Sequence, residues 1–249
     1  MMDSFIAAII ISAASFIGLI FGSTIAKKFV SRHLKYLVSF SAGVFFFTSF
    51  NLFKEAFEIA SPSLIFSGAV GGFFVFFLLE RILPESHHHH SGDCEHSHAK
   101  SGATRMLLGD AFHNIADGII IVPAFFVSTT VGIITTVSIL IHEILQEISE
   151  YFVLIGLGYS RWQAISRNVL VSLTIFIGVF IGFVVSSTEA IQAVLLSFSA
   201  GAFMYIIFHD LIPLSILKGN KRKAFSHVSF FIFGVLLLFL ISVSLPHAH

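Results

Sequence analysis

Residue types that bind metal ions recur in residues 105–127, an otherwise apolar segment. They stand at positions i, i+3, i+4 and i+7 of one stretch: Asp110, His113, Asn114 and Asp117. This spacing places all four side chains on one face of an α-helix. Imidazole nitrogens and carboxylate oxygens are ligands for zinc and for other first-row divalent ions. The segment therefore predicts one side of a metal-binding site.

A second apolar segment, residues 131–156, carries a matching polar stripe on one helix face: His142, Glu143, Gln146, Glu147 and Glu150. The connector around Ser128–Thr130 is very short, so the two segments predict an antiparallel helical hairpin. His113 lies about sixteen residues before this turn and His142 about thirteen after it, which places both at a similar depth. The two stripes are therefore expected to face each other.

The composition predicts that these helices cross a membrane. Of the 249 residues, 56% are hydrophobic and only 11% are charged, whereas soluble domains carry about 25% charged residues. The net charge is zero, so the overall charge of the chain gives no reason to expect nucleic-acid binding. The single cysteine, Cys94, excludes an internal disulfide framework.

Apolar runs of about 20 residues predict an all-α integral membrane protein with eight transmembrane helices. The first run is too long for a removable signal peptide and lacks a basic start and a cleavage site. We expect a single transmembrane domain over residues 1–249, with spans near 4–26, 35–54, 63–84, 105–127, 131–156, 164–186, 190–212 and 226–245.

The basic residues predict the orientation of the spans. Every Lys and Arg except Lys54 lies in or beside the loops after the first, third, fifth and seventh spans. Such a bias places these loops in the cytoplasm and both termini outside. We therefore expect a multi-pass protein of the plasma membrane, with a histidine-rich cytoplasmic loop at residues 85–103.

An internal repeat is also predicted. The sequence Ser-Phe-Ser-Ala-Gly occurs at residues 39–43 and again at residues 197–201, and the same offset sets Asn51 against His209. The two copies lie in the second and seventh spans, which run in opposite directions. This favours an inverted repeat, typical of transporters, in which spans 1–3 pair with spans 6–8 around a central hairpin. The alternative is that the small residues only mark close helix contacts.

The two stripes need charge compensation, because each ionisable group in a membrane costs a few kcal/mol. Neither span interior offers a Lys or Arg, so a bound dication or protons must compensate. A network of protonated acids joining helices is the structural alternative. A zinc metalloprotease is another, because His142 and Glu143 begin a sequence similar to H-E-x-x-H. Gln146, a weak neutral ligand, stands at the second histidine position.

The pattern G-D-x-x-H-N-x-x-D-G at residues 109–118, followed by H-E-x-x-Q-E at residues 142–147, resembles the ZIP (Zrt/Irt-like) family of divalent-metal transporters. The similarity is greatest to the branch whose fourth and fifth spans read H-N-x-x-D-G and H-E-I-P-H-E. The resemblance covers nearly the whole chain. It implies eight spans, outward termini, a histidine-rich cytoplasmic loop and a three-two-three inverted repeat.

The resemblance also implies a binuclear metal centre between the fourth and fifth spans. One site would use His113, Asp117, His142 and Gln146. The other would use Asn114 and Glu143, with Asp117 or Gln146 shared and Glu147 alongside. This sequence departs from the branch at two positions: Leu145 replaces a proline, and Gln146 replaces a histidine, which weakens the nitrogen ligand set.

The function implied by the resemblance is uptake of zinc toward the cytoplasm, with cadmium, iron and manganese as further candidate substrates. The expected partners are divalent metal ions and the lipid bilayer, without an organic cofactor or an enzymatic activity. A homodimer is compatible with the sequence. An intramembrane zinc metalloprotease and an exporter of the cation-diffusion type remain alternatives. The exporter class typically has six spans and a terminal cytoplasmic domain, for which this sequence has no counterpart.

Further polar groups have weaker assignments. The loop at residues 87–98 holds six His and Cys94, which favours loose metal binding or a solvated linker. Asn168 is interpreted as a helix-packing amide, with a pathway role as the alternative. Three other groups are interpreted as helix ends or tails that could also receive metal ions: His209 and Asp210; His247 and His249; and Asn51, Lys54, Glu55 and Glu58 at an entrance.

Overall fold

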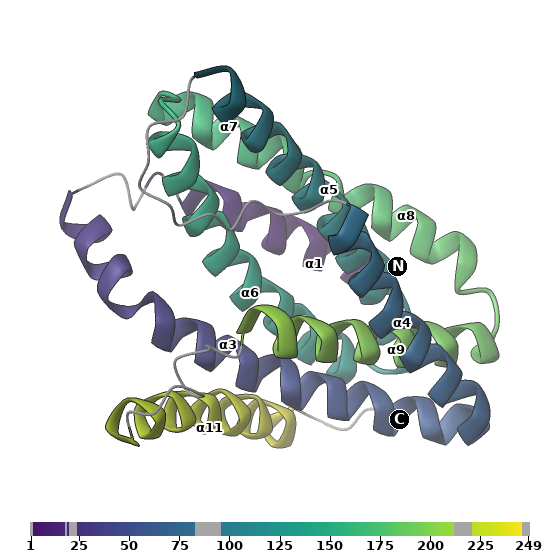
Figure 1. Ribbon diagram of the computed structural model, residues 1–249. Coiled ribbons are helices and arrows are strands. Elements are labelled where there is room, and N and C mark those ends of the chain that lie inside the picture. The colour runs from purple at the N-terminus through teal and green to yellow at the C-terminus, as the bar shows by residue number, and fades with distance from the viewer. Residues whose placement is uncertain (1, 18, 20–23, 83–95, 212–220, 246–249) are drawn as a thin grey trace.

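The computed structural model describes residues 2–17, 19, 24–82, 96–211 and 221–245 (Figure 1). These described residues form helices joined by turns, and they include no strand. The helices are α1 (Met2–Ser12), a 3₁₀ turn η1 (Ala13–Phe16), α3 (Thr24–Ile59), α4 (Pro62–Ile82), α5 (His96–Val127), α6 (Thr129–Gly156), α7 (Arg161–Ser172), α8 (Ile175–Val185), α9 (Glu189–Ile206), a π-helical turn η2 (Ile207–Leu211) and α11 (Lys221–Ser244).

Six helical segments among the described residues are long and apolar enough to cross a membrane. They are His33–Ile59, Met106–Val127, Thr129–Gly156, Arg161–Val185, Glu189–His209 and Ala224–Ser244. The predicted first and third spans correspond to shorter apolar helices, Met2–Phe16 and Pro62–Leu78. The all-helical membrane architecture predicted from composition is therefore confirmed.

Some helices differ in extent from the predicted spans. Among the described residues, the predicted span at 4–26 contains most of α1, all of η1 and the first residues of α3, which begins at Thr24. α5 begins at His96, inside the range 85–103 predicted as a loop. Both α3 and α5 start well before the apolar runs of the predicted spans, because hydropathy locates contact with lipid rather than the ends of helices. Residues 83–95, with most of the histidine-rich loop, and residues 246–249, with His247 and His249, lie outside the described residues.

The predicted span at 164–186 consists of two helices, α7 and α8, which meet at Leu173 and Thr174. The Thr174 amide donates to the Val171 carbonyl three residues back, at 2.9 Å, which tightens the turn. The Thr174 hydroxyl also contacts that carbonyl at 2.7 Å and the Ala111 carbonyl of α5 at 3.0 Å. Threonine bonding of this kind bends helices, so the bend is anchored against α5.

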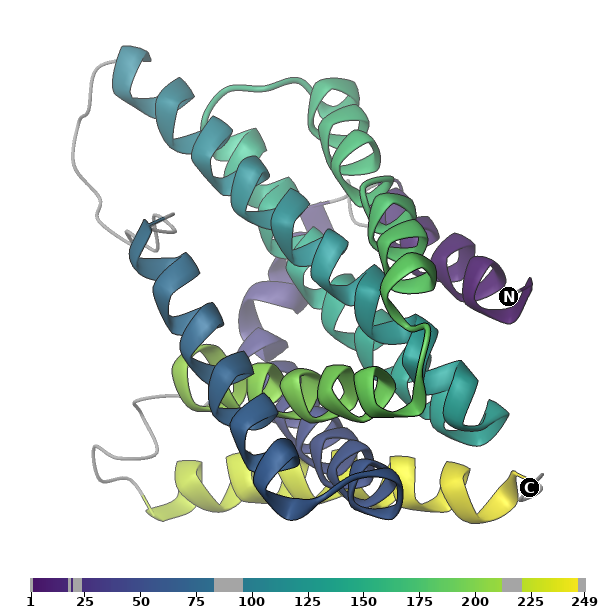
Figure 2. The same ribbon diagram turned by 90° about the vertical axis from the view of Figure 1, so that its right-hand side faces the viewer.

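The helices gather in two groups (Figures 1 and 2). One group holds α3, α4, α9 and α11, and the other holds α1, α5, α6, α7 and α8. Glycines bring backbones into direct contact within each group. A Cβ atom at Gly72 of α4 would lie 1.9 Å from the Phe198 carbonyl oxygen of α9, and one at Gly178 of α8 would lie 2.0 Å from that of Ile115 in α5. Small residues at helix contacts allow such close packing in membranes.

The two Ser-Phe-Ser-Ala-Gly copies make equivalent contacts. A Cβ atom at Gly43 of α3 would lie 2.0 Å from the Phe231 carbonyl oxygen of α11. A Cβ atom at Gly201 of α9 would lie 1.9 Å from the Ala69 carbonyl oxygen of α4. In the predicted repeat α3 corresponds to α9 and α11 to α4, so the contacts agree with that prediction.

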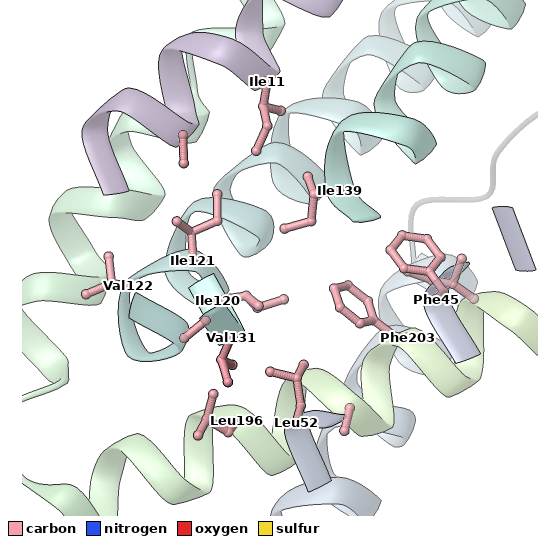
Figure 3. Close-up of a cluster of buried hydrophobic side chains, with 14 of the residues drawn as sticks. Ile11, Phe45, Leu52, Ile120, Ile121, Val122, Val131, Ile139, Leu196 and Phe203 are labelled. Atoms are coloured by element: carbon pink, nitrogen blue, oxygen red, sulfur yellow. The ribbon is translucent and has the colours of Figure 1, made fainter. Parts of the chain in front are cut away.

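An apolar core joins the two groups (Figure 3). Its labelled side chains come from α1, α3, α5, α6 and α9: Ile11, Phe45, Leu52, Ile120, Ile121, Val122, Val131, Ile139, Leu196 and Phe203. By contrast, α11 exposes large apolar side chains along its length, among them Phe225, Phe233, Phe239 and Leu240. Soluble proteins rarely expose contiguous apolar patches of this extent, so this face is suited to contact with lipid.

The glycine contacts generate a stability prediction. Gly72→Ala places a methyl group against a backbone atom that cannot rotate away, so we expect a loss of about 1–3 kcal/mol. The matched control is Gly156→Ala on α6, where an added Cβ atom meets nothing within 4 Å. Gly72→Ala should lower the melting temperature in detergent, and Gly156→Ala should not. Equal melting temperatures for both variants would contradict the packing account.

Candidate metal centre

The hairpin of α5 and α6 positions the predicted ligands. A single residue, Ser128, separates the two helices. Its hydroxyl accepts a hydrogen bond from the Val131 amide at 3.2 Å and so caps the start of α6. Serine at this position satisfies one of the free amides of the first helical turn. The short connector forces the helices to run antiparallel and side by side, as the sequence predicts.

Three ligand side chains converge between these helices. One ligand atom each of His113, His142 and Glu143 lies within 4.8 Å of the others. His113 Nε2 is 3.9 Å from Glu143 Oε1 and 3.7 Å from Asp117 Oδ2. The ring centroids of His113 and His142 are 5.2 Å apart. The stripes of α5 and α6 therefore face each other, as their spacing predicts.

This spacing is close to that of a zinc site. Zinc lies about 2.0–2.2 Å from nitrogen and oxygen ligands, so two ligand atoms of a tetrahedral site are about 3.5 Å apart. The separations of 3.9 Å between His113 and Glu143 and of up to 4.8 Å in the group of three need side-chain shifts of about an ångström. Rotamer adjustment supplies such shifts without moving the helices.

The ligand side chains are buried with unused bonding capacity. Asp117 and Glu143 are each 1% exposed, and His142 is 9% exposed. No group in the described part of the chain makes a hydrogen bond to Asp117 Oδ2, His142 Nδ1 or Glu143 Oε1. No described Lys or Arg side chain forms an ion pair with these carboxylates. Buried polar atoms in native proteins usually have partners, so this set is suited to receive a cation.

The two predicted amide ligands share one partner. The amide nitrogens of Asn114 and Gln146 both donate to Asp110 Oδ1, the former at 3.0 Å. The Asn114 amide also contacts the Asp110 backbone carbonyl at 3.1 Å. Asp110 thus ties α5 to α6 and fixes the orientation of both amides. The amide oxygen of Asn114 is buried without a hydrogen-bond partner among the described groups.

Glu147, predicted to lie alongside the second metal ion, is held from α7. The Asn168 amide donates to Glu147 Oε2 and, at 3.3 Å, to the Glu147 carbonyl oxygen. Both residues are 1% exposed. Asn168 therefore makes the interhelical contact expected of a packing amide. Glu147 Oε1 has no hydrogen-bond partner among the described groups.

Aromatic rings cover the two histidines. The ring centroid of Phe45 of α3 lies 4.9 Å from that of His142 and 4.5 Å from that of Phe203 of α9. Phe76 of α4 meets His113 edge-on at 6.2 Å. Sequence reasoning missed these rings, because nothing distinguishes them among 31 phenylalanines. They place the other helix group directly against the candidate centre.

Of the other predicted groups, His209 stacks on Tyr205 one turn earlier, with ring centroids 5.4 Å apart. Asp110 stood on the predicted stripe but was not among the predicted ligands; its role in joining two amides was not foreseen. Its position three residues before His113 was the available signal, since i and i+3 residues share a helix face.

Comparison with known proteins extends this description. The family model described as ZIP Zinc transporter matches residues 84–242, more than half of the chain. A curated protein named an uncharacterized zinc transporter, from Schizosaccharomyces pombe, is 33% identical over 129 residues, which is 46% of this chain and 28% of that protein.

Two human proteins have a comparable sequence identity to this chain. Zinc transporter ZIP4 is 34% identical over 117 residues, or 47% of this chain and 18% of ZIP4. Zinc transporter ZIP10 is 32% identical over 148 residues, or 57% of this chain and 18% of ZIP10. The match thus spans less than a third of the length of each of these relatives.

The contact between α7 and α6 generates the second prediction. Asn168→Ala removes both bonds to Glu147 and leaves a buried carboxylate without its donor, so we expect a loss of about 1–3 kcal/mol in stability. Ser166→Ala is the control, because Ser166 is exposed on the same helix and bonds only to the Gln163 carbonyl in the described structure. In metal-free detergent, Asn168→Ala should lower the melting temperature and Ser166→Ala should leave it unchanged. Equal melting temperatures would contradict the contact.

Proposed function

This chain belongs to the ZIP zinc transporter family, and from that premise we propose that it carries divalent metal ions, zinc foremost, across the membrane toward the cytoplasm. The observation that supports this most is the convergence of His113, His142 and Glu143 inside two membrane-spanning helices. Imidazole and carboxylate ligands hold zinc less permanently than four thiolates would. A site that must release its ion needs such lability.

We assign the centre two ions. One would be held by His113, Asp117, His142 and Gln146. The other would be held by Asn114 and Glu143, with Glu147 alongside and Asp117 or Gln146 bridging the two. The unpartnered oxygens of Asn114, Glu143 and Glu147 support the second site. Asp110 would hold the amide nitrogens so that the amide oxygens face the ions.

Movement of the ion would occur by alternating access, with one helix group rocking against the other around the centre. The close glycine contacts lie within each group, which supports their moving as units. The proposed centre would lie where the groups meet, since Phe45 of one group contacts His142 of the other and itself stacks on Phe203. Thr48 of α3 also hydrogen-bonds Ser138 of α6, one helical turn from His142. These contacts would close the centre toward the outside in this conformation.

The proposed topology has eight spans in a three-two-three inverted repeat, with both termini outside and the protein in the plasma membrane. The equivalent contacts of Gly43 and Gly201 support the repeat. The two shorter apolar helices, Met2–Phe16 and Pro62–Leu78, would be the first and third spans. An intramembrane protease gains no support from the comparisons, since ZIP proteins are transporters rather than enzymes.

A double variant tests the site. His113→Ala with His142→Ala removes both imidazoles, so zinc flux into proteoliposomes should fall at least about tenfold. The control is His227→Asn, which changes a buried histidine of α11 that bonds Ser39 at 2.7 Å, outside the proposed centre. Radioactive zinc uptake is the measurement. Unchanged uptake by the double variant would exclude this ligand assignment.

Flux should also depend on pH. Metal ions bind the deprotonated forms of imidazole and carboxylate, so protons compete with zinc at the centre. We expect the apparent KM to rise several-fold between about pH 7.5 and about pH 5.5, because the proton concentration rises about a hundredfold over this range while the ligands bind metal only when deprotonated. Raising the zinc concentration should restore the rate. A loss at acidic pH that saturating zinc cannot reverse would contradict competition at the ligands.

A further inference from the structure

A cavity of about 530 Å³ opens where α3 ends, beside the turn between α5 and α6 and the start of α9. Three carboxylates line it, those of Glu55, Glu58 and Glu189, together with the polar side chains of Asn51 and Gln192. Among the described residues that line it, Lys54 is the single basic one. In the proposed topology this cavity faces outside, and we refer to it as the outer vestibule.

Lys54 forms ion pairs with two of the three carboxylates. Its Nζ lies 3.3 Å from Glu55 Oε1 and 3.5 Å from Glu58 Oε1. The Glu55 side chain is 17% exposed, whereas those of Lys54 and Glu58 are 58% and 62% exposed. Exposed ion pairs of this kind contribute little to stability. The lysine can therefore leave the carboxylates when another cation arrives.

The sequence gives an independent reason to single out Lys54. Every other Lys and Arg lies at or near the loops assigned to the cytoplasm, as expected from the bias of basic residues toward that side. A basic residue in the acidic mouth of a cation pathway opposes the collection of cations. Because Lys54 lies next to two of the carboxylates, its charge could serve to limit the collection of cations there.

We propose that Lys54 is a tethered cation that competes with divalent metal ions for Glu55 and Glu58, and thereby sets the concentration at which the outer vestibule collects metal. The proposal rests on the proposed function. It assigns Lys54 to the capture of substrate and leaves the ligands of the buried centre unchanged. Lys54 is thus a residue that determines apparent affinity.

Distance limits what this charge can do. Lys54 lies nine residues beyond Phe45 on α3, which contacts His142, so it is about 13 Å from the centre along the helix. Exposed charges are screened over about 8 Å at physiological salt. Lys54 should therefore change the local concentration of cations in the vestibule and have little effect on binding at His142. In kinetic terms KM changes and Vmax does not.

The test is zinc uptake by proteoliposomes with Lys54→Gln, Lys54→Arg and Lys35→Gln. Removing the charge makes the vestibule more negative, and a dication about 6 Å away then gains about a two- to fivefold higher local concentration. We expect Lys54→Gln to lower KM by that factor with Vmax unchanged. Lys54→Arg, which keeps the charge, should match the wild type. Lys35→Gln, which removes an exposed charge in the first third of α3, should also match the wild type.

Ionic strength supplies the second readout. The difference in KM between Lys54→Gln and wild type should disappear at about 0.5 M salt, where charges are screened within about 4 Å. A KM that Lys54→Gln leaves unchanged or raises, or a change that persists at high salt, would overturn the proposal. These outcomes require a wild-type protein that transports zinc. Absence of wild-type uptake would instead overturn the proposed function.

Discussion

The burial of ionisable side chains on α5 and α6 is the constraint on which the rest of this structure depends. Asp117, Glu143 and Glu147 lie inside membrane-spanning helices, and no described Lys or Arg side chain pairs with them. A buried charge without a partner is costly in lipid, and a buried pair is tolerated only where its geometry is good. The protein brings two imidazoles to the same point. Together these groups form a set of ligands that a divalent cation would complete.

The surrounding helices hold these side chains in position. A one-residue turn aligns α5 with α6, Asp110 holds two amides across the hairpin, and Asn168 holds Glu147 from α7. Among the described residues, the second helix group contacts the site through aromatic rings and a hydroxyl group. One group thus supplies the proposed ligands and the other supplies a cover. Such a division lets the cover move without dismantling the ligand set, which alternating access requires.

Much of this could be predicted from the sequence, because the strongest constraints are local. The positions of His113 and His142 relative to Ser128 place them at one depth, and helical spacing puts each ligand on the facing stripe. The start of α3 and the bend at Thr174 could not be predicted, since hydropathy locates lipid contact rather than helix ends. The Phe45 and Phe203 contacts and the shared bonds of Asp110 depend on how distant helices pack. No periodicity within a single helix contains that information.

The location of the bound ion is the most direct test of the account. Crystals of the full chain soaked in zinc, with anomalous scattering recorded at the zinc absorption edge, would place the ion without reference to transport. We predict the strongest anomalous peak between α5 and α6, about 2.0–2.2 Å from nitrogen or oxygen atoms of His113, His142 and a carboxylate. A fully zinc-loaded crystal with no peak between these helices would contradict the account.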